Sequence, residues 1–336
     1  MPRSPAASRG RATRNDVAKL AGVSPAVVSY VVNGTKKVGA ATEERVRDAV
    51  AKLGYRANPS ARALRLGSTE MLGMVMPTAM NPYFAQLAHE VEVAAAKRGY
   101  MVLTFTSDSS VVAERDQLEQ LAGRLVDGVF LCSTVSEPDL RSLDLAGIPI
   151  VLLNNSVTLP TRDSVGVDLL HGAHLAVEHL AEHGYTDIGM VAGVGDVGGD
   201  QQDARETGWL ESLERLGLTP GAIVRGTFTP DGGYEAMRRL IRSRSVPRAL
   251  FVGSDQMARG VLRAAHEAGL RVPEDVAVVS FDGSLDAAYS WPTLTSVAQP
   301  LSEMAEAAVD ALVGPPHERL HLVVDAHLVL GRSCGC

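Results

Sequence analysis

Two short motifs in this chain contain residue types that bind metals. The first, His179-Leu-Ala-Glu-His183, has the His-x-x-Glu-His order of some zinc enzymes and lies in a stretch with helical periodicity. Residues four apart share a helix face, so both imidazoles could reach one zinc ion. However, no strong third ligand is apparent, and the helix is expected to bury Leu175, Ala176 and Leu180 with the histidines near its outer side. We therefore do not predict a zinc enzyme.

The second motif is the end of the chain, Cys334-Gly-Cys336. Thiolates are good ligands for soft metals, but two soft ligands alone do not complete a tetrahedral site. With Cys132 the chain has three cysteines, and this odd number and the spacing of one residue suit reduced thiols in a reducing compartment. The sequence therefore predicts free thiols and no bound metal.

A third motif, Gly193-Val-Gly-Asp-Val-Gly198, matches the Gly-x-Gly-x-x-Gly pattern of dinucleotide-binding proteins. That fingerprint belongs in a first strand–helix unit whose next strand ends in Asp or Glu, whereas the corresponding strand here, IVRGTF, has no terminal acid. We interpret 193–198 as a flexible loop of a cleft. Since there is also no Gly-x-Ser-x-Gly elbow and no nucleophile with an obvious base, we predict that the chain is not an enzyme and binds no cofactor.

Another kind of chemistry is indicated by the aromatic, amide and charged residues placed where predicted strands end. Aromatic faces stack on flat rings, and an Arg with an Asp can hydrogen-bond sugar hydroxyls or a base edge. Ligands of open α/β sheets bind at the carboxyl ends of strands, so these residues are expected to face one pocket. Asp255 has a second explanation, as the N-cap of a helix over 256–268. The candidates are Tyr83, Phe84, Asn154, Arg205, Trp209, Phe228, Asp255 and Asp282.

Alternating strands and helices must position these residues. From Met71 onward, short apolar stretches alternate with longer amphipathic ones. This alternation predicts an α/β core of doubly wound parallel sheets. A second cycle begins after about residue 163, which predicts two similar lobes with a cleft between them.

Charge divides the chain into two parts. Residues 1–66 hold 13 Lys and Arg against 4 Asp and Glu, a net charge of +9, whereas residues 67–336 hold 19 against 35, a net charge of −16. A basic module neutralises phosphates and releases counterions, while an acidic surface is repelled from a duplex. The charge pattern therefore predicts a DNA reader attached to a sensor.

Length and hydropathy limit the class of protein. At 336 residues and 46% apolar content, the chain can form two to three domains with full-sized cores. No apolar run is long enough to span a membrane, and the Arg-rich start MPRSPAASRGRATR is not followed by the apolar region of a secretory signal. We expect a cytoplasmic protein without a membrane partner.

Residues 14–57 have the pattern of a helix-turn-helix headpiece. A short helix ends at Gly22, and Ser24 then caps a second helix that starts with Pro25. A third helix, expected over 42–53, closes a three-helix core. The first exposed residues of the second helix face base edges in such units. A small protein-interaction domain is the alternative, but the turn, the caps and the net charge all favour DNA binding.

Several segments of the chain are similar to one family along almost its entire length. The headpiece supplies DVAKLAGVSPAVVSYVVNG and TEERVRDAVAKLGYRANPSARALRLG. The remainder supplies NPYFAQLAHEVEVAAAKRGY, VDGVFL, VEHLAEHGYTDIGMVAG, SDQMARGVLRAAHEAGLRVPEDVAVVSFD and LTSVAQP, in the family's order and spacing. The chain thus resembles the lactose-repressor (LacI/GalR) family of bacterial transcription regulators. The resemblance implies a helix-turn-helix headpiece joined to a two-lobed core like that of periplasmic binding proteins.

The resemblance also implies how DNA is bound. A dimer would bind a near-palindromic operator with the second helix in the major groove and a hinge helix over 58–65 in the minor groove. Leu64 would wedge into the central base step, although it could instead be an apolar linker contact. Tyr30 departs from the Arg that many members carry, so the operator preference is not implied. The implied DNA-binding residues are Thr13, Ser24, Pro25, Ala26, Ser29, Tyr30, Asn33, Asn58, Arg62, Leu64 and Arg65.

For the effector, the resemblance implies a sugar, a sugar phosphate or a nucleoside-like molecule held between the lobes. Asp282 and Arg205 would be the main polar contacts, and Gln299 a further one from the crossover segment. The apolar walls would be Tyr83, Phe84 and Phe228. The chain departs from the family's common pattern at Ser254 and Asn154, so the identity of the ligand is not implied.

The predicted organisation has five parts. They are a disordered basic tail over 1–13, a headpiece over 14–57, a hinge and linker over 58–67, a first lobe over 68–163 and 293–320, and a second lobe over 164–292 and 321–336. A homodimer is expected, since no leucine heptad follows the core. A transport-type sugar-binding protein with no DNA role is the alternative, but such a carrier would have a signal peptide where this chain has its headpiece.

Overall fold

The computed structural model describes residues 12–56, 63, 67–108, 110–123, 126–132, 147–154, 159–194 and 203–336. The chain divides into two compact units, Met1–Thr69 and Glu70–Cys336. Residues 1–11 of the expected tail and the expected hinge residues Asn58, Arg62, Leu64 and Arg65 lie outside the described residues. Within the described ranges, no helix combines the length and the apolar character needed to cross a membrane.

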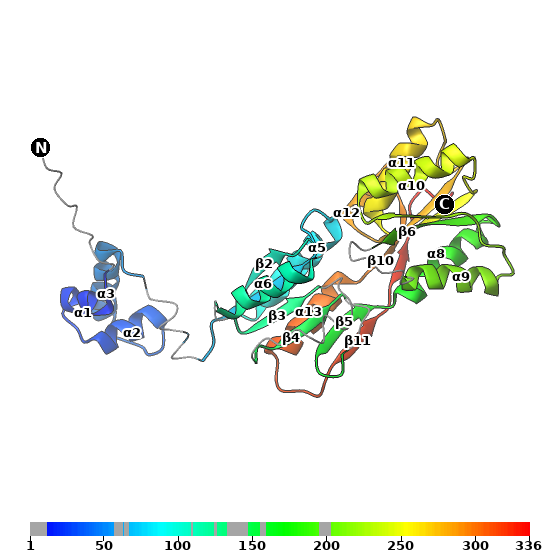
Figure 1. The fold of residues 1–336 in the computed structure, drawn as a ribbon. Coiled ribbons are helices and arrows are strands. Elements are labelled where there is room, and N and C mark those ends of the chain that lie inside the picture. Colours follow the sequence, from blue (N-terminus) through cyan, green and yellow to red (C-terminus); the bar gives the residue numbers. More distant parts are fainter. Residues whose placement is uncertain are drawn as a thin grey trace, which may run out of the picture. The chain divides into compact units, whose positions relative to one another are not determined.

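The first unit contains the three expected helices, labelled in Figure 1: α1 (Arg14–Ala21), α2 (Pro25–Asn33) and α3 (Ala40–Leu53). The third helix begins two residues before the expected Thr42. Each helix ends at a glycine in the left-handed conformation, which a residue without a Cβ adopts at little cost. Small and β-branched residues form the shared core: Val17, Ala18, Ala21, Val28, Val46 and Ala49.

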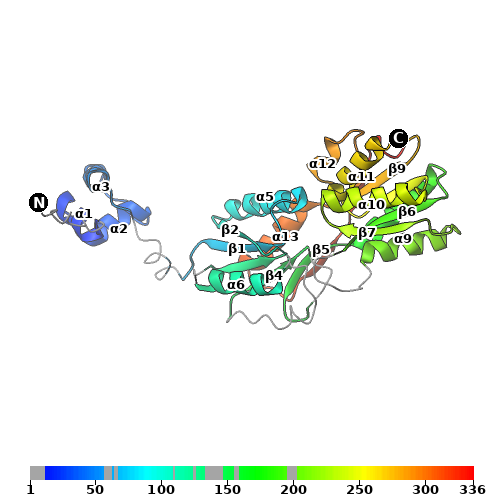
Figure 2. The same cartoon turned by 45° about the horizontal axis from the view of Figure 1, so that its top comes forward.

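The first lobe of the second unit is built on a six-stranded sheet in the order β11-β5-β4-β3-β1-β2, with every neighbouring pair parallel. Its strands are β1 (Met71–Met76), β2 (Met101–Thr106), β3 (Gly128–Leu131), β4 (Ile150–Leu153), β5 (Asp163–Val167) and β11 (His321–Val324). Helices α5 (Pro82–Lys97) and α13 (Leu301–Val313) pack on one face and α6 (Val111–Gly123) on the other, as Figure 2 shows.

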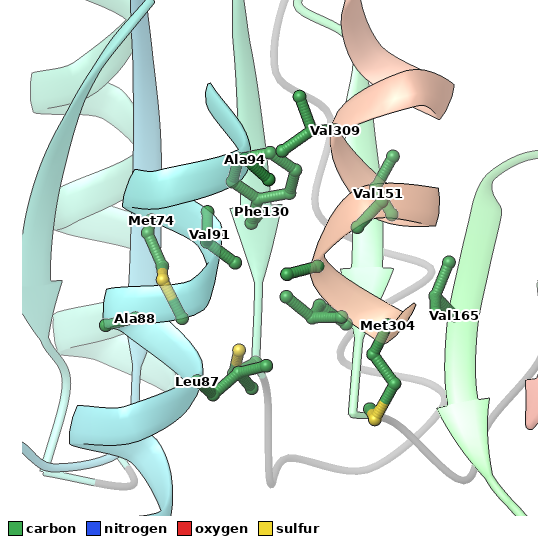
Figure 3. Close-up of a cluster of buried hydrophobic side chains, with 14 of the residues drawn as sticks. Met74, Leu87, Ala88, Val91, Ala94, Phe130, Val151, Val165, Met304 and Val309 are labelled. Carbon is green, nitrogen blue, oxygen red and sulfur yellow. The ribbon is translucent and has the colours of Figure 1, made fainter. Parts of the chain in front are cut away.

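Figure 3 shows the core between this sheet and the helices α5 and α13. The inner strands β1, β3 and β4 are buried on both faces and are almost continuously apolar, as expected for a parallel sheet. Apolar residues of α5 recur at helical spacing, so one stripe of the helix faces the strands. The contributing residues include Met74, Leu87, Ala88, Val91, Ala94, Phe130, Val151, Val165, Met304 and Val309.

The second lobe repeats the plan with the order β12-β10-β9-β8-β6-β7, in which only the pair β10 and β12 is antiparallel. Its strands are β6 (Ile188–Val194), β7 (Ile223–Thr227), β8 (Ala249–Val252), β9 (Ala277–Asp282), β10 (Thr295–Ala298) and β12 (His327–Val329). Its helices are α8 (Leu169–Glu182), α9 (Ala204–Arg215), α10 (Pro230–Ser243), α11 (Asp255–Glu267) and α12 (Leu285–Ala288). Helices α8 and α9 cover one face, and α10 and α11 cover the other.

The chain crosses between the lobes three times, after β5, after β10 and after β11. The α/β fold with a helix-turn-helix headpiece and two parallel-sheet lobes is confirmed. The expected lobe boundaries, however, are a few residues wrong, because β5 and β11 belong to the first sheet and β10 to the second. Hydrogen-bond partners decide which sheet a strand joins, and the apolar pattern of a strand does not specify those partners.

Candidate DNA interface and effector site

The start of α2 exposes the residues expected at base edges. Ser24 is the N-cap, and its hydroxyl accepts a hydrogen bond of 3.3 Å from the backbone N–H of Val27. Pro25 and Ala26 follow in the first turn and are exposed. Neither can form a side-chain hydrogen bond, so their contribution at a groove is limited to apolar contact, for example with a thymine methyl group.

One turn later, Ser29, Tyr30 and Asn33 are half-buried. Asn33 Nδ2 donates to the carbonyl oxygen of Ser29 at 2.8 Å and to its hydroxyl at 3.0 Å. The Lys36 ammonium lies 5.6 Å from the centre of the Tyr30 ring. This cation places positive charge beside a reading position, which suits a nearby phosphate. Sequence reasoning did not single out Lys36.

Thr13 is exposed and has a structural explanation at the start of α1. It forms a capping box with Asp16: the Thr13 hydroxyl and backbone N–H donate to Asp16 Oδ2 at 2.7 and 2.8 Å, and the Asp16 N–H donates back at 3.3 Å. The side-chain hydrogen bond from Thr13 lowers the pKa of Asp16. The pair therefore fixes the first turn of the helix-turn-helix unit.

In the second unit, Tyr83 contacts side chains of both lobes. It follows the N-cap Asn81 at the start of α5 and is buried. Its hydroxyl lies 2.7 Å from Asn154 Oδ1, at the end of β4, and 2.9 Å from Gln299 Oε1, directly after β10. Burial, and then the charge of Asp282, raise the pKa of Tyr83 well above its usual value, so the phenol keeps its donor proton.

Asp282 ends β9 and is almost fully buried. Gln299 Nε2 donates to its Oδ1 at 3.1 Å, and the backbone N–H of Asp255 also bonds to its carboxylate. Its φ of 112° lies in a region that favours glycine and is found mostly at functional sites. Burial, and then the nearby charge of Asp255, raise the pKa of Asp282 well above its usual value, although Arg205 opposes the shift.

Arg205 lies in the first turn of α9, two residues after the N-cap Asp203. Its Nε–H donates a hydrogen bond to Asp203 Oδ1 at 2.9 Å, and one terminal nitrogen donates to Asp203 Oδ2 at 2.7 Å. The other terminal nitrogen donates to the carbonyl oxygen of Gly253 at 2.9 Å. The guanidinium also lies 4.8 Å from the Phe228 ring centre and 5.3 Å from that of Phe281. These bonds use three of the roughly five N–H groups of a guanidinium, so within the described part of the chain two are left to bind a ligand.

Phe228 directly follows β7 and lies against the bare backbone of Gly193 at the end of β6. A Cβ at Gly193 would be 2.1 Å from the ring, so only glycine fits beneath Phe228. Gly193 thus supports an aromatic wall and gives the glycine motif a packing role; its other two glycines lie outside the described residues. Phe84 makes an edge contact with Tyr83, with ring centres 5.2 Å apart.

Asp255 differs from the prediction. Its carboxylate accepts four hydrogen bonds, from the hydroxyls of Ser280 and Ser296 at 2.6 Å each and from the backbone and hydroxyl of Ser284 at 2.6 and 2.9 Å. The N-cap of α11 is Ser254, whose hydroxyl accepts from the Met257 N–H at 3.2 Å. Asp255 therefore joins β9, β10 and α12 instead of facing a ligand.

Trp209 also differs from the prediction. It lies on α9 but is 1% exposed and packs in the second-lobe core with Leu213 and Phe251. Its indole N–H has no acceptor among the residues that the structure describes. Trp209 lies one helical turn after Arg205 on the same face of α9, and at that level of the helix this face packs on the lobe core.

Sequence reasoning missed Asp203, Phe281 and Gly253, which position Arg205. Asp203 had a usable signal, because an Asp directly before a helix is a common N-cap. Phe281 and Gly253 had none, since Phe281 lies on β9 and Gly253 directly after β8, both distant in sequence from α9.

Comparison with known proteins gives the family. Residues 13–58 match the bacterial regulatory proteins of the lacI family, and residues 177–334 match the periplasmic binding protein-like domain. The HTH-type transcriptional repressor PurR of Pasteurella multocida is 32% identical over 96% of this chain and 98% of its own length. The PurR repressor of Edwardsiella ictaluri is 35% identical over 90% of this chain and 89% of its own length.

Solved structures agree. A lac repressor dimer bound to operator and the anti-inducer ONPF has a TM-score of 0.84 and 27% identity, covering 96% of this chain and 99% of that chain. A complex of the transcriptional regulator CelR with cellobiose has a TM-score of 0.69 and 34% identity, covering 96% of this chain and all of that chain. The prediction that the chain is not an enzyme agrees with this family. The chain belongs to the lacI family of bacterial regulatory proteins and is a DNA-binding transcriptional repressor.

Proposed function

We propose that this repressor binds a near-palindromic operator as a homodimer and that a small molecule held between its two lobes controls the binding. The operator-bound dimer of the lac repressor, similar over 96% of this chain, supports the oligomeric state. The exposed start of α2 supports major-groove binding. A repressor of this kind works in the cytoplasm, where the chromosome is.

DNA binding is tested on duplexes selected from a random pool by the full chain. Affinity should fall steeply with salt, because Lys and Arg release counterions from phosphates. Lys36→Ala should reduce the salt slope, whereas Glu44→Ala on the exposed surface of α3 serves as the control for a surface change. Failure of the full chain to enrich any duplex at low salt would contradict the proposal.

The observation that carries the effector site is the chain of contacts from Asn154 through Tyr83 and Gln299 to Asp282. It joins groups at the ends of β4 and β9, which belong to different sheets. A ligand bonded to Asp282 and Tyr83 would replace contacts that connect the lobes, and this gives it different affinities for different lobe arrangements. Arg205, Phe228 and Phe84 complete the proposed site with a cation and two aromatic faces.

The ligand is proposed to be a ring with several donors, as in a sugar, a sugar phosphate or a nucleoside-like molecule. A buried carboxylate accepts hydroxyl or ring N–H groups, and aromatic faces pack on the ring. The cellobiose complex of CelR, which is 34% identical to this chain, supports a sugar. A thermal-shift screen should find a ligand that, at 100 times its dissociation constant, stabilises the chain by about 2.7 kcal/mol.

Control of DNA binding is proposed to pass through the hinge over 58–65, whose Leu64 would enter the minor groove. Leu64→Ala should weaken operator binding and leave effector binding unchanged. Equal loss of both would show that Leu64 is a folding contact and not a wedge. Operator titrations with and without the ligand also decide whether the effector releases or strengthens DNA binding.

A further inference from the structure

Four metal-binding side chains that are far apart in sequence converge at one end of α8. They are His179 and His183, near the end of the helix and directly after it, and Cys334 and Cys336 at the end of the chain. One ligand atom from each lies within 4.8 Å of all the others. The cluster belongs to the second lobe and shares no residue with the proposed DNA interface or effector site.

Four of the six separations between these ligand atoms are close to those around a tetrahedral metal. His179 Nε2 lies 3.3 Å from Cys334 Sγ and 3.4 Å from Cys336 Sγ, and His183 Nε2 lies 3.2 Å from Cys336 Sγ. The two sulfurs are 3.2 Å apart. With Zn–S of about 2.3 Å and Zn–N of about 2.0–2.1 Å, ligand atoms around one tetrahedral zinc are separated by about 3.3–3.8 Å.

The fold fixes each half of the cluster. His179 and His183 are separated by about one helical turn, and their rings make an edge contact with centres 4.7 Å apart. Cys334 is fully buried, and its Sγ lies 2.9 Å from Thr295 Oγ1. Next to it, Ser333 Oγ donates to the carbonyl of Val278 at 2.6 Å, which ties the chain end to β9.

Gly335 turns the chain between the two cysteines. Its φ of 101° lies in the region that favours glycine, and this conformation brings both sulfurs to the same side. His183 and Cys336 are exposed, so an ion has access from solvent, while Cys334 anchors the inner side. All four positions of a tetrahedron are then protein ligands, which is the arrangement of a structural metal and not of a catalytic one.

We propose that His179, His183, Cys334 and Cys336 bind one Zn²⁺ that fastens the C-terminal segment to α8. Neither sequence motif alone has enough ligands for a zinc site, and the fold supplies to each motif the ligands that it lacks. His-x3-His on a helix is a common zinc spacing, whereas Cys-x-Cys is one residue shorter than usual and depends on the turn at Gly335. The site is independent of operator and effector.

The test begins with metal content. The untagged full chain, purified under reducing conditions, should contain one zinc per chain by elemental analysis. After zinc removal, added Co²⁺ should give the intense visible d–d bands of a tetrahedral site and thiolate charge-transfer absorption. His183→Ala and Cys336→Ser remove exposed ligands, so the variants should fold; each should lose the Co²⁺ spectrum and weaken zinc binding by more than about 100-fold.

Matched controls are present in the chain. His171→Ala removes another exposed histidine of α8, and Cys132→Ser removes a thiol of the first lobe; both should keep wild-type zinc content. Thr295→Val should weaken zinc about 10-fold, because it removes the hydroxyl next to Cys334. The proposal is wrong if the reduced chain takes up no Co²⁺, if both controls lose metal like the ligand variants, or if Cys334 and Cys336 form a disulfide in the presence of reductant and zinc.

Discussion

Asp255 and Asp282 are two buried carboxylates at strand and helix ends of the same lobe, and the sequence favoured both as ligands for the effector. Asp255 accepts four hydrogen bonds from three serines. From the residues that the structure describes, Asp282 receives one side-chain bond, from Gln299, and one backbone bond, and it lies near Arg205 and Tyr83. Burial raises the pKa of both residues, most strongly that of Asp282.

The difference lies in how far the protein itself satisfies each group. A carboxylate with four donors has no capacity left for a ligand and holds strands together. A buried carboxylate with fewer donors keeps lone pairs for a partner from outside and loses stability while that partner is absent. Burial alone therefore does not identify a binding residue, whereas the count of satisfied lone pairs does.

The largest expected effect is on stability at Asp255. Asp255→Ala would leave the hydroxyls of Ser280, Ser284 and Ser296 without their acceptor in the core, so the free energy of unfolding should fall by about 3 kcal/mol or more. Urea unfolding followed by circular dichroism measures this. Asp231→Ala, in the exposed first turn of α10, should change stability by only a few tenths of a kcal/mol. Equal losses for Asp255→Ala and Asp231→Ala would show that the four hydrogen bonds of Asp255 do not stabilise the core.

The second effect is on ligand binding at Asp282. Asp282→Ala should weaken the effector by about 10- to 100-fold, because a charged hydrogen bond contributes about 1.5–3 kcal/mol, and it should leave operator binding without effector unchanged. Calorimetry with the ligand from the thermal-shift screen gives the affinity, and a gel shift gives operator binding. An unchanged effector titration would refute the proposed site.

A smaller effect is expected at Gly193, which supports Phe228. Gly193→Ala should displace the ring and weaken the effector about 10-fold, with a stability loss of about 1–3 kcal/mol. Phe228→Ala should cause a similar loss of affinity, and the double variant should lose little more, because both changes remove the same aromatic wall. Additive losses in affinity would show that Gly193 acts elsewhere.

The smallest effect is the pH dependence that comes from Asp282. Its folded-state pKa lies above the unfolded value of 3.8, so the folded chain binds the proton more tightly, and stability falls as pH rises above that value. Asp282→Asn removes this contribution, so its free energy of unfolding should increase relative to wild type as pH rises from about 4 to 7. Thermal unfolding at a series of pH values checks this. A parallel pH dependence in the two proteins would show that the carboxyl is not destabilised by burial.

Much of the fold and part of the candidate site could be predicted. The headpiece helices, the alternating strands and the positions of Tyr83, Phe228 and Asp282 at element ends follow from local periodicity and caps. Sheet membership of β5, β10 and β11 could not be predicted, since the sequence pattern of a strand does not specify its hydrogen-bond partners. For the same reason, sequence patterns did not separate Asp255 from Asp282.

The sequence by itself determined the family, the two-part charge distribution and the amphipathic elements, because these depend on residue types and on spacings of a few positions. Only the tertiary structure decided which distant residues meet. It placed serine donors around the Asp255 carboxylate and the Phe281 ring beside the Arg205 guanidinium. It also brought His179 and His183 to Cys334 and Cys336 across more than 150 positions. Such contacts depend on how strands cross and helices pack, and no local pattern encodes the distance between two segments that only folding brings together.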